Sequence, residues 1–311
     1  TELTVLVPFG TSFQYITVTN LTTHFTAYAS RPFVVTYASN GLFDFAAKVD
    51  FPIGTATTLT KLSLGDLDGD GKVDVVVPNT TNNTVTILRN TSPIGSFSFQ
   101  STLTLPTGAS PRVVTMGDLD GDGKLDLAVS NYDDNNIYVF RNNTAAVGSL
   151  SFTSPVILAT GSGPYALVVQ DFNRDGKPGI AVANYNSGSV SMYHNTSSVG
   201  HISFGTKYDI FTGTQPYSVA ACDFNLDGFP DLAVANYGDN TVSVIQNKSL
   251  SLGNFDFTLV ANMATGNGPA ELAIGDLDGD AKSDLGVALS LDGNVSVFRN
   301  VSTSSTVNFT L

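Results

Sequence analysis

One acidic loop, copied five times at a fixed spacing, constrains this chain of 311 residues more than any other feature of its sequence. It reads GDLDGDGKVD at Gly65 and returns as GDLDGDGKLD at Gly117, QDFNRDGKPG at Gln170, CDFNLDGFPD at Cys222 and GDLDGDAKSD at Gly275. The first aspartates stand at positions 66, 118, 171, 223 and 276, so the spacing alternates between 52 and 53 residues. A period of this length indicates one supersecondary unit copied along the chain, and such units must pack on one another to bury a core.

The residues around each loop predict an all-β unit. In the second unit PRVVTMGDL leads into the loop, DLAVSNY leaves it, IYVFRNN follows a polar DDNN turn, and LSFTSPVIL comes after a longer connection. Four short strands bounded by Gly, Pro, Asn or Asp suit the blades of a β-propeller, in which radial repetition protects the strand edges. No helical period of 3.6 residues is visible, which argues against a solenoid of helix pairs.

The side chains within each loop predict a calcium site. Position 1 is Asp, position 3 is Asp or Asn, position 5 is Asp, position 6 is usually Gly, and position 9 is usually Asp. Carboxylate and carbonyl oxygens are the ligands that Ca²⁺ prefers, and a Gly at position 6 permits the reversal that brings a carbonyl at position 7 into the set. No Glu stands at position 12, so these are not standard EF-hand loops.

The predicted side-chain ligands are Asp66, Asp68, Asp70 and Asp74; Asp118, Asp120, Asp122 and Asp126; Asp171, Asn173 and Asp175; Asp223, Asn225, Asp227 and Asp231; and Asp276, Asp278, Asp280 and Asp284. The predicted carbonyl ligands are those of Lys72, Lys124, Lys177, Phe229 and Lys282. We expect up to five calcium ions. The loop at Asp171 should bind most weakly because it offers the fewest carboxylates, and the first two loops should bind best.

Charge arithmetic supports the metal hypothesis. The chain has 27 acidic and 14 basic residues, a net charge of −13, and most of the acidic residues lie in these loops. Two carboxylates about 4 Å apart repel by roughly 4 kcal/mol at the effective dielectric of a protein surface, so clusters of this kind need compensation. Bound divalent cations would supply it.

With these motifs the chain resembles FG-GAP/VCBS repeats, the calcium-binding propeller blades of integrin α-chains and of many bacterial surface proteins. The resemblance covers roughly residues 40 to 311 and rests on the aspartate loops, the DLAVANY strand at Asp231–Tyr237 and a repeated Gly-x-x-Pro step, as at Gly108 and Pro111. It implies that each loop joins the innermost strand of a blade to the second strand. The departures at Gly179 and Ala281 bear on calcium occupancy rather than on the fold.

Residues 1–38 have strand-like sequence but no aspartate loop, so we predict a division into residues 1–38 and a propeller of residues 39–311. The first segment resembles the closing strands of an Ig-like IPT/TIG domain, and the alternative is a divergent blade. Six outermost strands are predicted, beginning with Phe43–Phe51, against five innermost strands. Either the N-terminal strands complete a sixth blade, or an unpaired edge is left for another chain.

Five asparagines recur along the chain with the same spacing as the acidic loops. Asn90, Asn142, Asn195, Asn247 and Asn300 each begin an Asn-x-Ser/Thr triplet. In a secreted protein this triplet is a glycan acceptor, which makes the five asparagines glycosylation candidates. The alternative is that one structural strand end, copied with the repeat, carries the triplet along.

Composition narrows the function classes. Millimolar calcium outside cells suits open carboxylate loops, so we expect an extracellular protein, secreted or attached to a cell surface. With no signal-peptide pattern at Thr1, a secreted form would already be the mature chain. No apolar run reaches the 18 residues of a membrane span, and the 14 Lys and Arg are too few for a nucleic-acid surface.

We do not expect an enzyme, because the aspartates are engaged by metal and His24, His194 and His201 stand outside the repeated positions. The leading hypothesis is a calcium-stabilised structural or adhesive propeller that assembles, through its N-terminal strands, with copies of itself into a filament, or binds surface proteins and glycans. The alternative is a carbohydrate-binding propeller that uses Tyr132, Tyr185 and Tyr237. A calcium-dependent polysaccharide lyase is the third hypothesis.

Overall fold

The computed structural model describes residues 17–19, 26–28, 48–53, 61–249 and 255–310. The chain forms two compact units, Thr1–Asp50 and Phe51–Leu311. In the first unit, β1 (Thr17–Thr19) pairs antiparallel with β2 (Thr26–Tyr28). The two hypotheses for residues 1–38, and assembly through their strands, lie largely outside the described residues. The strand predicted at Phe43–Phe51 also lies partly outside them, and its described residues 48–51 form no strand.

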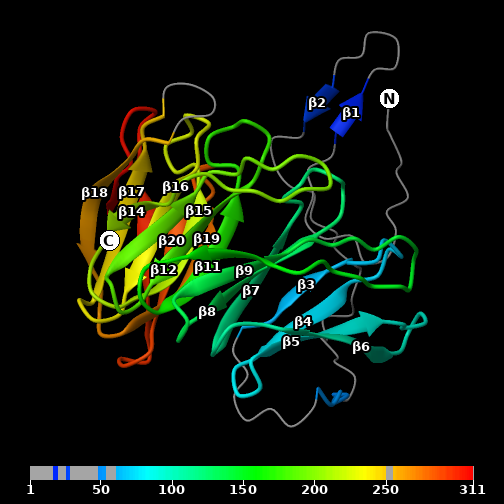
Figure 1. The fold of residues 1–311 in the computed structure, drawn as a ribbon. Helices are drawn as coiled ribbons and strands as arrows, with labels where there is room; N and C mark the ends of the chain where they lie inside the picture. The colour runs from blue at the N-terminus through cyan, green and yellow to red at the C-terminus, as the bar shows by residue number, and fades with distance from the viewer. Residues whose placement is uncertain (1–16, 20–25, 29–47, 54–60, 250–254, 311) are drawn as a thin grey trace. The chain divides into compact units, whose positions relative to one another are not determined.

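The described part of the second unit contains five four-stranded antiparallel sheets, one for each acidic loop (Figure 1). We call them blades one to five. Blade one is β3 (Ser63–Gly65), β4 (Asp74–Asn79), β5 (Thr84–Asn90) and β6 (Phe99–Pro106); blade two is β7 (Pro111–Gly117), β8 (Asp126–Asn131), β9 (Asn136–Phe140) and β10 (Val156–Ala159); blade three is β11 (Pro164–Gln170), β12 (Gly179–Asn184), β13 (Ser189–Tyr193) and β14 (Tyr208–Phe211). Blade four is β15 (Pro216–Cys222), β16 (Asp231–Asn236), β17 (Thr241–Asn247) and β18 (Phe257–Ala264); blade five is β19 (Pro269–Gly275), β20 (Asp284–Leu289), β21 (Asn294–Asn300) and β22 (Phe309–Thr310). The predicted all-β class and the four strands per repeat are confirmed.

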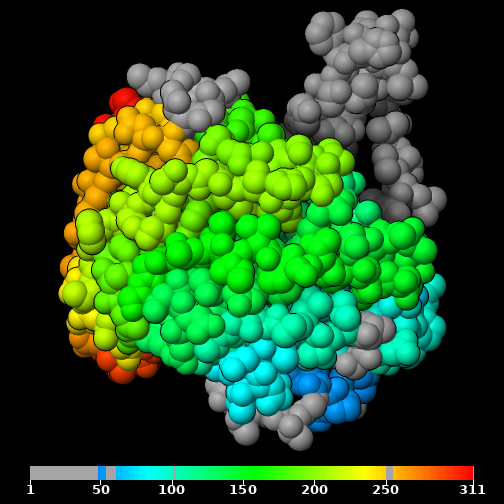
Figure 2. Space-filling model, in the orientation of Figure 1, coloured from blue at the N-terminus to red at the C-terminus, as the bar shows by residue number. Residues whose placement is uncertain are grey.

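The strands of each blade lie in sequence order, and the acidic loop joins the first strand to the second. The first strands of consecutive blades are neighbours: β3 lies beside β7, β7 beside β11, β11 beside β15, and β15 beside β19. The first strand is therefore the innermost one, as the resemblance implied. On the surface, consecutive blades follow one another as bands of colour (Figure 2).

Small and β-branched residues fill the second strands because these strands are covered on both faces. Every residue of β8, β12 and β16 is buried, and their sequences are DLAVSN, GIAVAN and DLAVAN. Strands covered on both faces are expected to be apolar along their whole length rather than alternating. Alanine at the central positions lets adjacent blades approach closely.

Four apolar clusters form the core, one between each pair of consecutive blades. We call the face that a blade turns toward the following blade its trailing face, and the opposite face its leading face. Between blades two and three, the trailing face supplies Leu119, Ile137 and Val139, and the leading face supplies Leu167 and Ile180. Each trailing face uses position 2 of the acidic loop and two residues of the third strand.

Turns between the second and third strands connect neighbouring blades. Asn135 and Asn240 adopt φ angles of 54° and 57°, a left-handed conformation that Asn tolerates better than most residues. Their Oδ1 atoms accept hydrogen bonds from the backbone N–H groups of Gly163 and Gly268, each at 2.8 Å. These glycines belong to the Gly-x-x-Pro steps, so the step is where one blade is anchored to the next.

Candidate metal centre

All five acidic loops share one backbone conformation. In the second loop Asp118 accepts hydrogen bonds from the N–H groups of Gly121 at 2.8 Å and Gly123 at 2.9 Å. Positions 4 and 6 are left-handed in every loop, with φ between 56° and 94°. Arg174 and Leu226 take this conformation at position 4, and Ala281 takes it at position 6 with φ of 70°. Replacement of glycine has therefore not changed the loop, although it costs backbone strain.

Three of the loops bring carboxylates together. The oxygens of Asp66, Asp68 and Asp70 lie within 4.8 Å of one another, as do those of Asp118, Asp120 and Asp122 and those of Asp276, Asp278 and Asp284. The predicted side-chain ligands are thus not all equivalent: position 5 joins the cluster in the first two loops, and position 9 joins it in the fifth. Converging hard oxygens fit a divalent cation of the calcium type.

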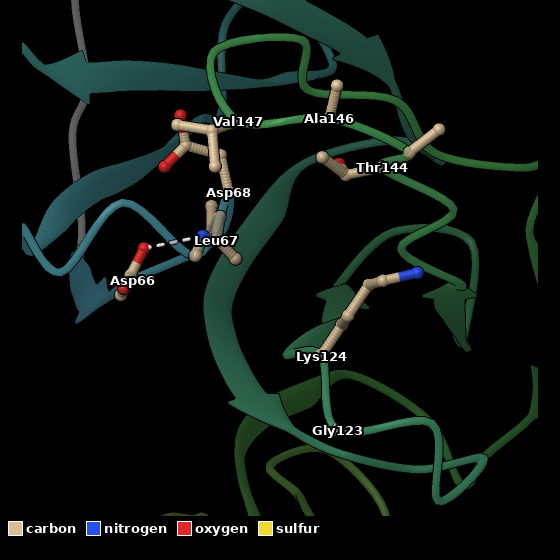
Figure 3. A pocket seen from close by; sticks show the side chains of 10 residues that line it. Asp66, Leu67, Asp68, Gly123, Lys124, Thr144, Ala146 and Val147 are labelled. Carbon is tan, nitrogen blue, oxygen red and sulfur yellow. Dashed lines mark hydrogen bonds between the residues drawn. The ribbon is translucent and has the colours of Figure 1, made fainter.

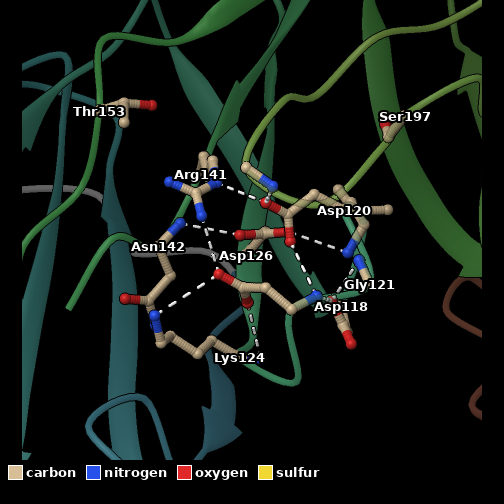
Figure 4. A network of polar contacts seen from close by, with 12 residues as sticks. Asp118, Asp120, Gly121, Lys124, Asp126, Arg141, Asn142, Thr153 and Ser197 are labelled. Atoms are coloured by element: carbon tan, nitrogen blue, oxygen red, sulfur yellow. Dashed lines mark hydrogen bonds and ion pairs between the residues drawn. The ribbon is translucent and has the colours of Figure 1, made fainter. Parts of the chain in front are cut away.

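An arginine partly neutralises each of these three clusters. Arg141 donates from Nε to Asp120 and from Nη2 to Asp122 at 2.8 Å (Figure 4). Arg89 and Arg299 occupy the same place in the first and fifth loops. Burial acts to raise the pKa of Asp120, but hydrogen bonds from Arg141 and from Gly200 outweigh it and hold that pKa below its usual value. The carboxylate of Asp120 is therefore ionised at neutral pH, as cation binding requires.

Our sequence interpretation missed these arginines, although a signal was present. Arginine precedes the repeated asparagine in the units whose position 3 is Asp, whereas His194 and Gln246 precede it where position 3 is Asn173 or Asn225. In the latter loops the Asn amide itself donates to the Asp at position 5, at 3.0 Å to Asp175 and 2.8 Å in the fourth loop. A negative charge at position 3 is thus accompanied by an arginine before the repeated asparagine, and its loss is accompanied by the loss of that arginine.

The aspartate at position 9 is buried and accepts two backbone hydrogen bonds, in addition to being a predicted metal ligand. Asp126 accepts from the N–H of Leu119 and from the N–H of Asn142, both at 2.8 Å. The same pair of hydrogen bonds recurs at Asp74, Asp231 and Asp284. Burial raises the pKa of Asp126 to about 6 and that of Asp231 to about 7. A cation would favour the ionised form of both groups.

The third loop differs for a packing reason. A Cβ on Gly179 would lie 2.7 Å from the carbonyl oxygen of Tyr193, so position 9 has no room for an aspartate. Asp175 instead contacts His194 at 2.9 Å. Asp171 Oδ1 is buried and has no hydrogen-bond partner within the described structure. A buried carboxylate oxygen without a hydrogen-bond partner is suited to a cation, so even this loop fits a metal ligand set, with fewer charges.

The repeated asparagines are inter-blade hydrogen-bond donors in the structure. Asn142 Nδ2 donates to the carbonyl of Leu125 in its own loop at 3.1 Å and to that of Leu67 in the preceding blade at 2.8 Å. Asn195, Asn247 and Asn300 make the equivalent pair of bonds and are buried like Asn142. Both amide hydrogens are engaged, so these four side chains are not accessible as glycan acceptors in the folded chain. Asn90 is half-buried and its amide bonds the carbonyl of Val73 at 2.9 Å.

Long connections between third and fourth strands reach back to the preceding acidic loop. The N–H of Gly148 donates to Asp68 at 2.8 Å, and the N–H of Gly200 donates to Asp120 at 2.9 Å. Figure 3 shows the first of these junctions, where Asp66, Asp68 and the segment from Thr144 to Val147 line one pocket. The first two acidic loops therefore lie at joints between blades.

A second candidate site is formed by tyrosines at the other end of the inner strands. The predicted Tyr132, Tyr185 and Tyr237 make ring contacts with Tyr165 and Tyr217, the closest pair having centroids 4.2 Å apart. The guanidinium of Arg112 lies 5.0 Å from the ring centre of Tyr132 and 5.5 Å from that of Tyr165. A cavity of about 300 Å³ is lined by Lys61, Arg112, Val113, Tyr165, Ala166, Tyr217 and Glu271.

Comparison with known families agrees with this architecture. The model of the FG-GAP-like repeat matches residues 24–77, 66–129, 118–182, 171–234 and 223–287. The first match begins within residues 1–38. No curated protein sequence matches the chain.

Solved structures share the fold at low sequence identity. The chain is similar to BBS1N from a complex with ARL6DN, with a TM-score of 0.54 and 15% identity over 83% of this chain and 70% of that one. It is similar to a functionally unknown protein from Desulfotomaculum acetoxidans DSM 771, with a TM-score of 0.56 and 14% identity over 81% and 69% of the two chains. A lectin from Agrocybe aegerita, described as recognising non-reducing terminal N-acetylglucosamine, has a TM-score of 0.53 and 19% identity over 80% of this chain and 65% of the lectin.

Proposed function

The chain belongs to the FG-GAP-like repeat family, and on that premise we propose that it is an extracellular structural or adhesive protein. Calcium stabilises its propeller, and it assembles with other copies of itself or with surface proteins and glycans. The observation that carries the proposal is that the first two carboxylate clusters lie at joints between blades. Calcium bound there would hold neighbouring blades together as well as the loop itself.

Bound calcium would contribute a large part of the free energy of unfolding of this protein. A ligand that binds only the folded state at 100 times its dissociation constant adds about 2.7 kcal/mol per site. Three carboxylate clusters would together add about 8 kcal/mol, which is comparable with the whole stability of an ordinary domain. A protein built in this way suits a compartment where calcium is permanently high, and this supports the extracellular assignment. Among the described residues, no helix has both the length and the apolar character to cross a membrane.

The direct test is calcium titration of chelator-treated protein by isothermal calorimetry, with elemental analysis of untreated protein. We expect at least three bound calcium ions per chain. Magnesium at the same concentration is the control, because its demand for an octahedral, mostly hydrated shell suits these loops less well. Absence of both calcium binding and bound metal would contradict the proposal.

Carbohydrate binding is the second candidate function, and the tyrosine cluster favours it. Half-exposed aromatic rings beside Arg112 and Glu271 offer apolar faces and charged hydrogen-bonding groups within one cavity, which is the usual make-up of a small-ligand site. The resemblance to the Agrocybe aegerita lectin concerns the fold alone. A glycan array, repeated with Tyr165→Ala and Tyr217→Ala, tests this candidate: binding that disappears in both variants supports it, and no binding by the parent chain excludes it for the glycans tested.

A further inference from the structure

Tyr165 and Tyr217 form a close contact between two blades. Tyr165 is the second residue of β11 in blade three, and Tyr217 is the second residue of β15 in blade four. The Tyr165 hydroxyl donates a hydrogen bond to the Tyr217 hydroxyl at 2.7 Å, and the ring centroids lie 4.2 Å apart with an angle of 42° between the rings. Aromatic pairs usually have centroids about 4.5–7 Å apart. The hydroxyl ends of these two rings are therefore in contact, and the ring carbons beside the hydroxyls are neighbours.

The close pair belongs to the tyrosine cluster, which has five rings. The other ring contacts within the cluster are longer, with centroids between 5.5 and 6.3 Å apart. Electrons transfer readily between aromatic rings at such separations, so a radical formed on any ring of the cluster can reach the close pair. Two radicals in this cluster would therefore meet where the hydroxyl ends are in contact.

Among the five repeats, two tyrosines stand in neighbouring innermost strands only at this joint. Each follows the proline of a Gly-x-x-Pro step, Pro164 or Pro216, and the two are 52 residues apart. Arg112 and Ala270 stand at the same rank in blades two and five. The close pair is therefore specific to the joint between blades three and four and is not a general feature of the repeat.

The same joint carries the acidic loop with the fewest carboxylates. β11 ends at the third acidic loop, where Asn247 of blade four donates to the carbonyl of Phe172 at 2.8 Å. Because this loop is predicted to bind calcium most weakly, calcium should stabilise this joint least. Cys222 is the single cysteine, so no disulfide can form within these 311 residues. A covalent bond between the blades would have to use other side chains.

We propose that Tyr165 and Tyr217 are a site of oxidative cross-linking, at which a dityrosine bond joins blade three to blade four. The oxidant is hydrogen peroxide acting through a haem peroxidase. Rings held in contact react as an intramolecular pair, which favours this bond over cross-links between molecules. The inference goes beyond the proposed function and does not depend on calcium binding.

The reaction balances with one molecule of hydrogen peroxide. Each phenol loses one electron and one proton, which gives two phenoxyl radicals. The radicals couple through one carbon–carbon bond between the carbons beside the hydroxyls. The hydrogen on each of these carbons then moves as a proton to the neighbouring oxygen, which restores both rings and both hydroxyls. The two electrons and two protons released reduce hydrogen peroxide to water, so the protein loses two hydrogen atoms.

The bond should stabilise the fold because it restricts the unfolded chain. It closes a loop between residues 52 positions apart, and cross-links of such span lower the conformational entropy of the unfolded state. We expect the melting temperature of the cross-linked monomer to rise by about 5–10 °C over that of the untreated protein in the same calcium buffer.

Peroxidase treatment of the full chain tests the site. Dilute protein treated with haem peroxidase and hydrogen peroxide in calcium buffer should give a monomer with dityrosine fluorescence and a mass lower by two hydrogen atoms. Peptide mass spectrometry should link Tyr165 to Tyr217. Tyr165→Phe and Tyr217→Phe should each reduce the yield of cross-linked monomer at least tenfold and abolish the rise in melting temperature.

Tyr208→Phe is the matched control. Tyr208 lies on β14 outside the tyrosine cluster and is 46% exposed, so its replacement should leave the yield of cross-linked monomer unchanged. Circular dichroism before treatment verifies that all three variants fold.

Four results would overturn the inference. Cross-links that form mainly between molecules at Tyr208 would show that reactivity follows exposure and not contact between rings. Cross-linked monomer that persists in both Tyr165→Phe and Tyr217→Phe would place the bond elsewhere. Absence of cross-linked monomer from the parent chain would remove the site, and an unchanged melting temperature of cross-linked parent would remove its stabilising role.

Discussion

The loop at Asp118 and the loop at Asp171 have the same backbone turns but different charges. The second loop gathers Asp118, Asp120 and Asp122 beside Arg141, whereas the third has Asn173 at position 3 and no carboxylate at position 9. Both loops are held to the preceding blade by a buried asparagine. The comparison shows that the loop conformation is maintained by hydrogen bonds common to all repeats, while the number of carboxylates in the loop varies independently of it.

Removal of calcium is expected to have the largest effect. Chelation with EGTA should lower the melting temperature by at least about 10 °C, because the carboxylate clusters at the blade joints would lose their compensating charge. Differential scanning calorimetry with and without calcium measures the shift. An unchanged melting temperature in protein shown to be metal-free would break the link between loop charge and blade packing.

Loss of the buried asparagine should affect both loops alike. Asn142→Ala and Asn195→Ala each leave two backbone carbonyls without their donor, and we expect a loss of about 2–4 kcal/mol in the free energy of unfolding for either variant. Urea unfolding in EGTA measures this loss without a contribution from metal. Asn90→Ala is the matched control and should cost less, since Asn90 makes one such bond. Unequal losses for the first two variants would show that the loops differ in more than charge.

Position 3 should account for most of the difference in affinity. Asp120→Asn gives the second loop the residue found in the third, and we expect its calcium affinity to fall about tenfold, or about 1.4 kcal/mol. Asp175→Asn should have a smaller effect on total calcium binding because its loop starts with the lower affinity. Calorimetric titration of both variants decides the ranking. If the third loop proves to be the tightest site, ranking by carboxylate number is wrong.

The smallest expected effect is a difference in pH dependence. Burial raises the pKa of Asp126 from 3.8 to about 6, so in the absence of calcium this group binds its proton more tightly when folded. Protonation of Asp126 therefore increases the free energy of unfolding of the calcium-free protein as the pH falls from above 6 toward 4. Calcium must compete with that proton for the carboxylate. We expect the affinity of the second loop to fall several-fold between pH 7.5 and 5.5. The third loop, with Gly179 at position 9, should change less, and Asp126→Asn should reduce the pH dependence of the second.

Much of the fold could be predicted from the chain alone. The strict spacing, the four strand-like segments in each unit and the Gly-x-x-Pro steps led to five four-stranded blades, and the structure confirms them. The aspartates at positions 1, 3 and 5 converge in the first two loops, but the ranking of the loops by calcium affinity stays a prediction. Calcium itself, the extracellular location and self-assembly also stay predictions.

The repeated asparagines show where sequence reasoning reaches its limit, and glycosylation itself stays untested. The triplets at Asn142 and its equivalents have the sequence of a glycosylation site. In the structure, however, each side-chain amide donates a hydrogen bond to the backbone carbonyl of a residue 75 or 76 positions earlier. No local pattern contains that information. The alternative that a structural strand end carries the triplet agrees with the hydrogen bonds observed.

By itself the sequence determined the repeating unit, the strand pattern and the acidic groups of each loop, because periodicity and side-chain chemistry are properties of short segments. The tertiary structure decided which atoms of one blade meet the next: the lack of space for a side chain at Gly179, the arginines beside the clusters, and the faces of blades one and five that are exposed in the part of the chain that the structure describes. The physical reason is that these features depend on close packing between segments one repeat apart, and packing is set by distances that spacing in the chain does not specify.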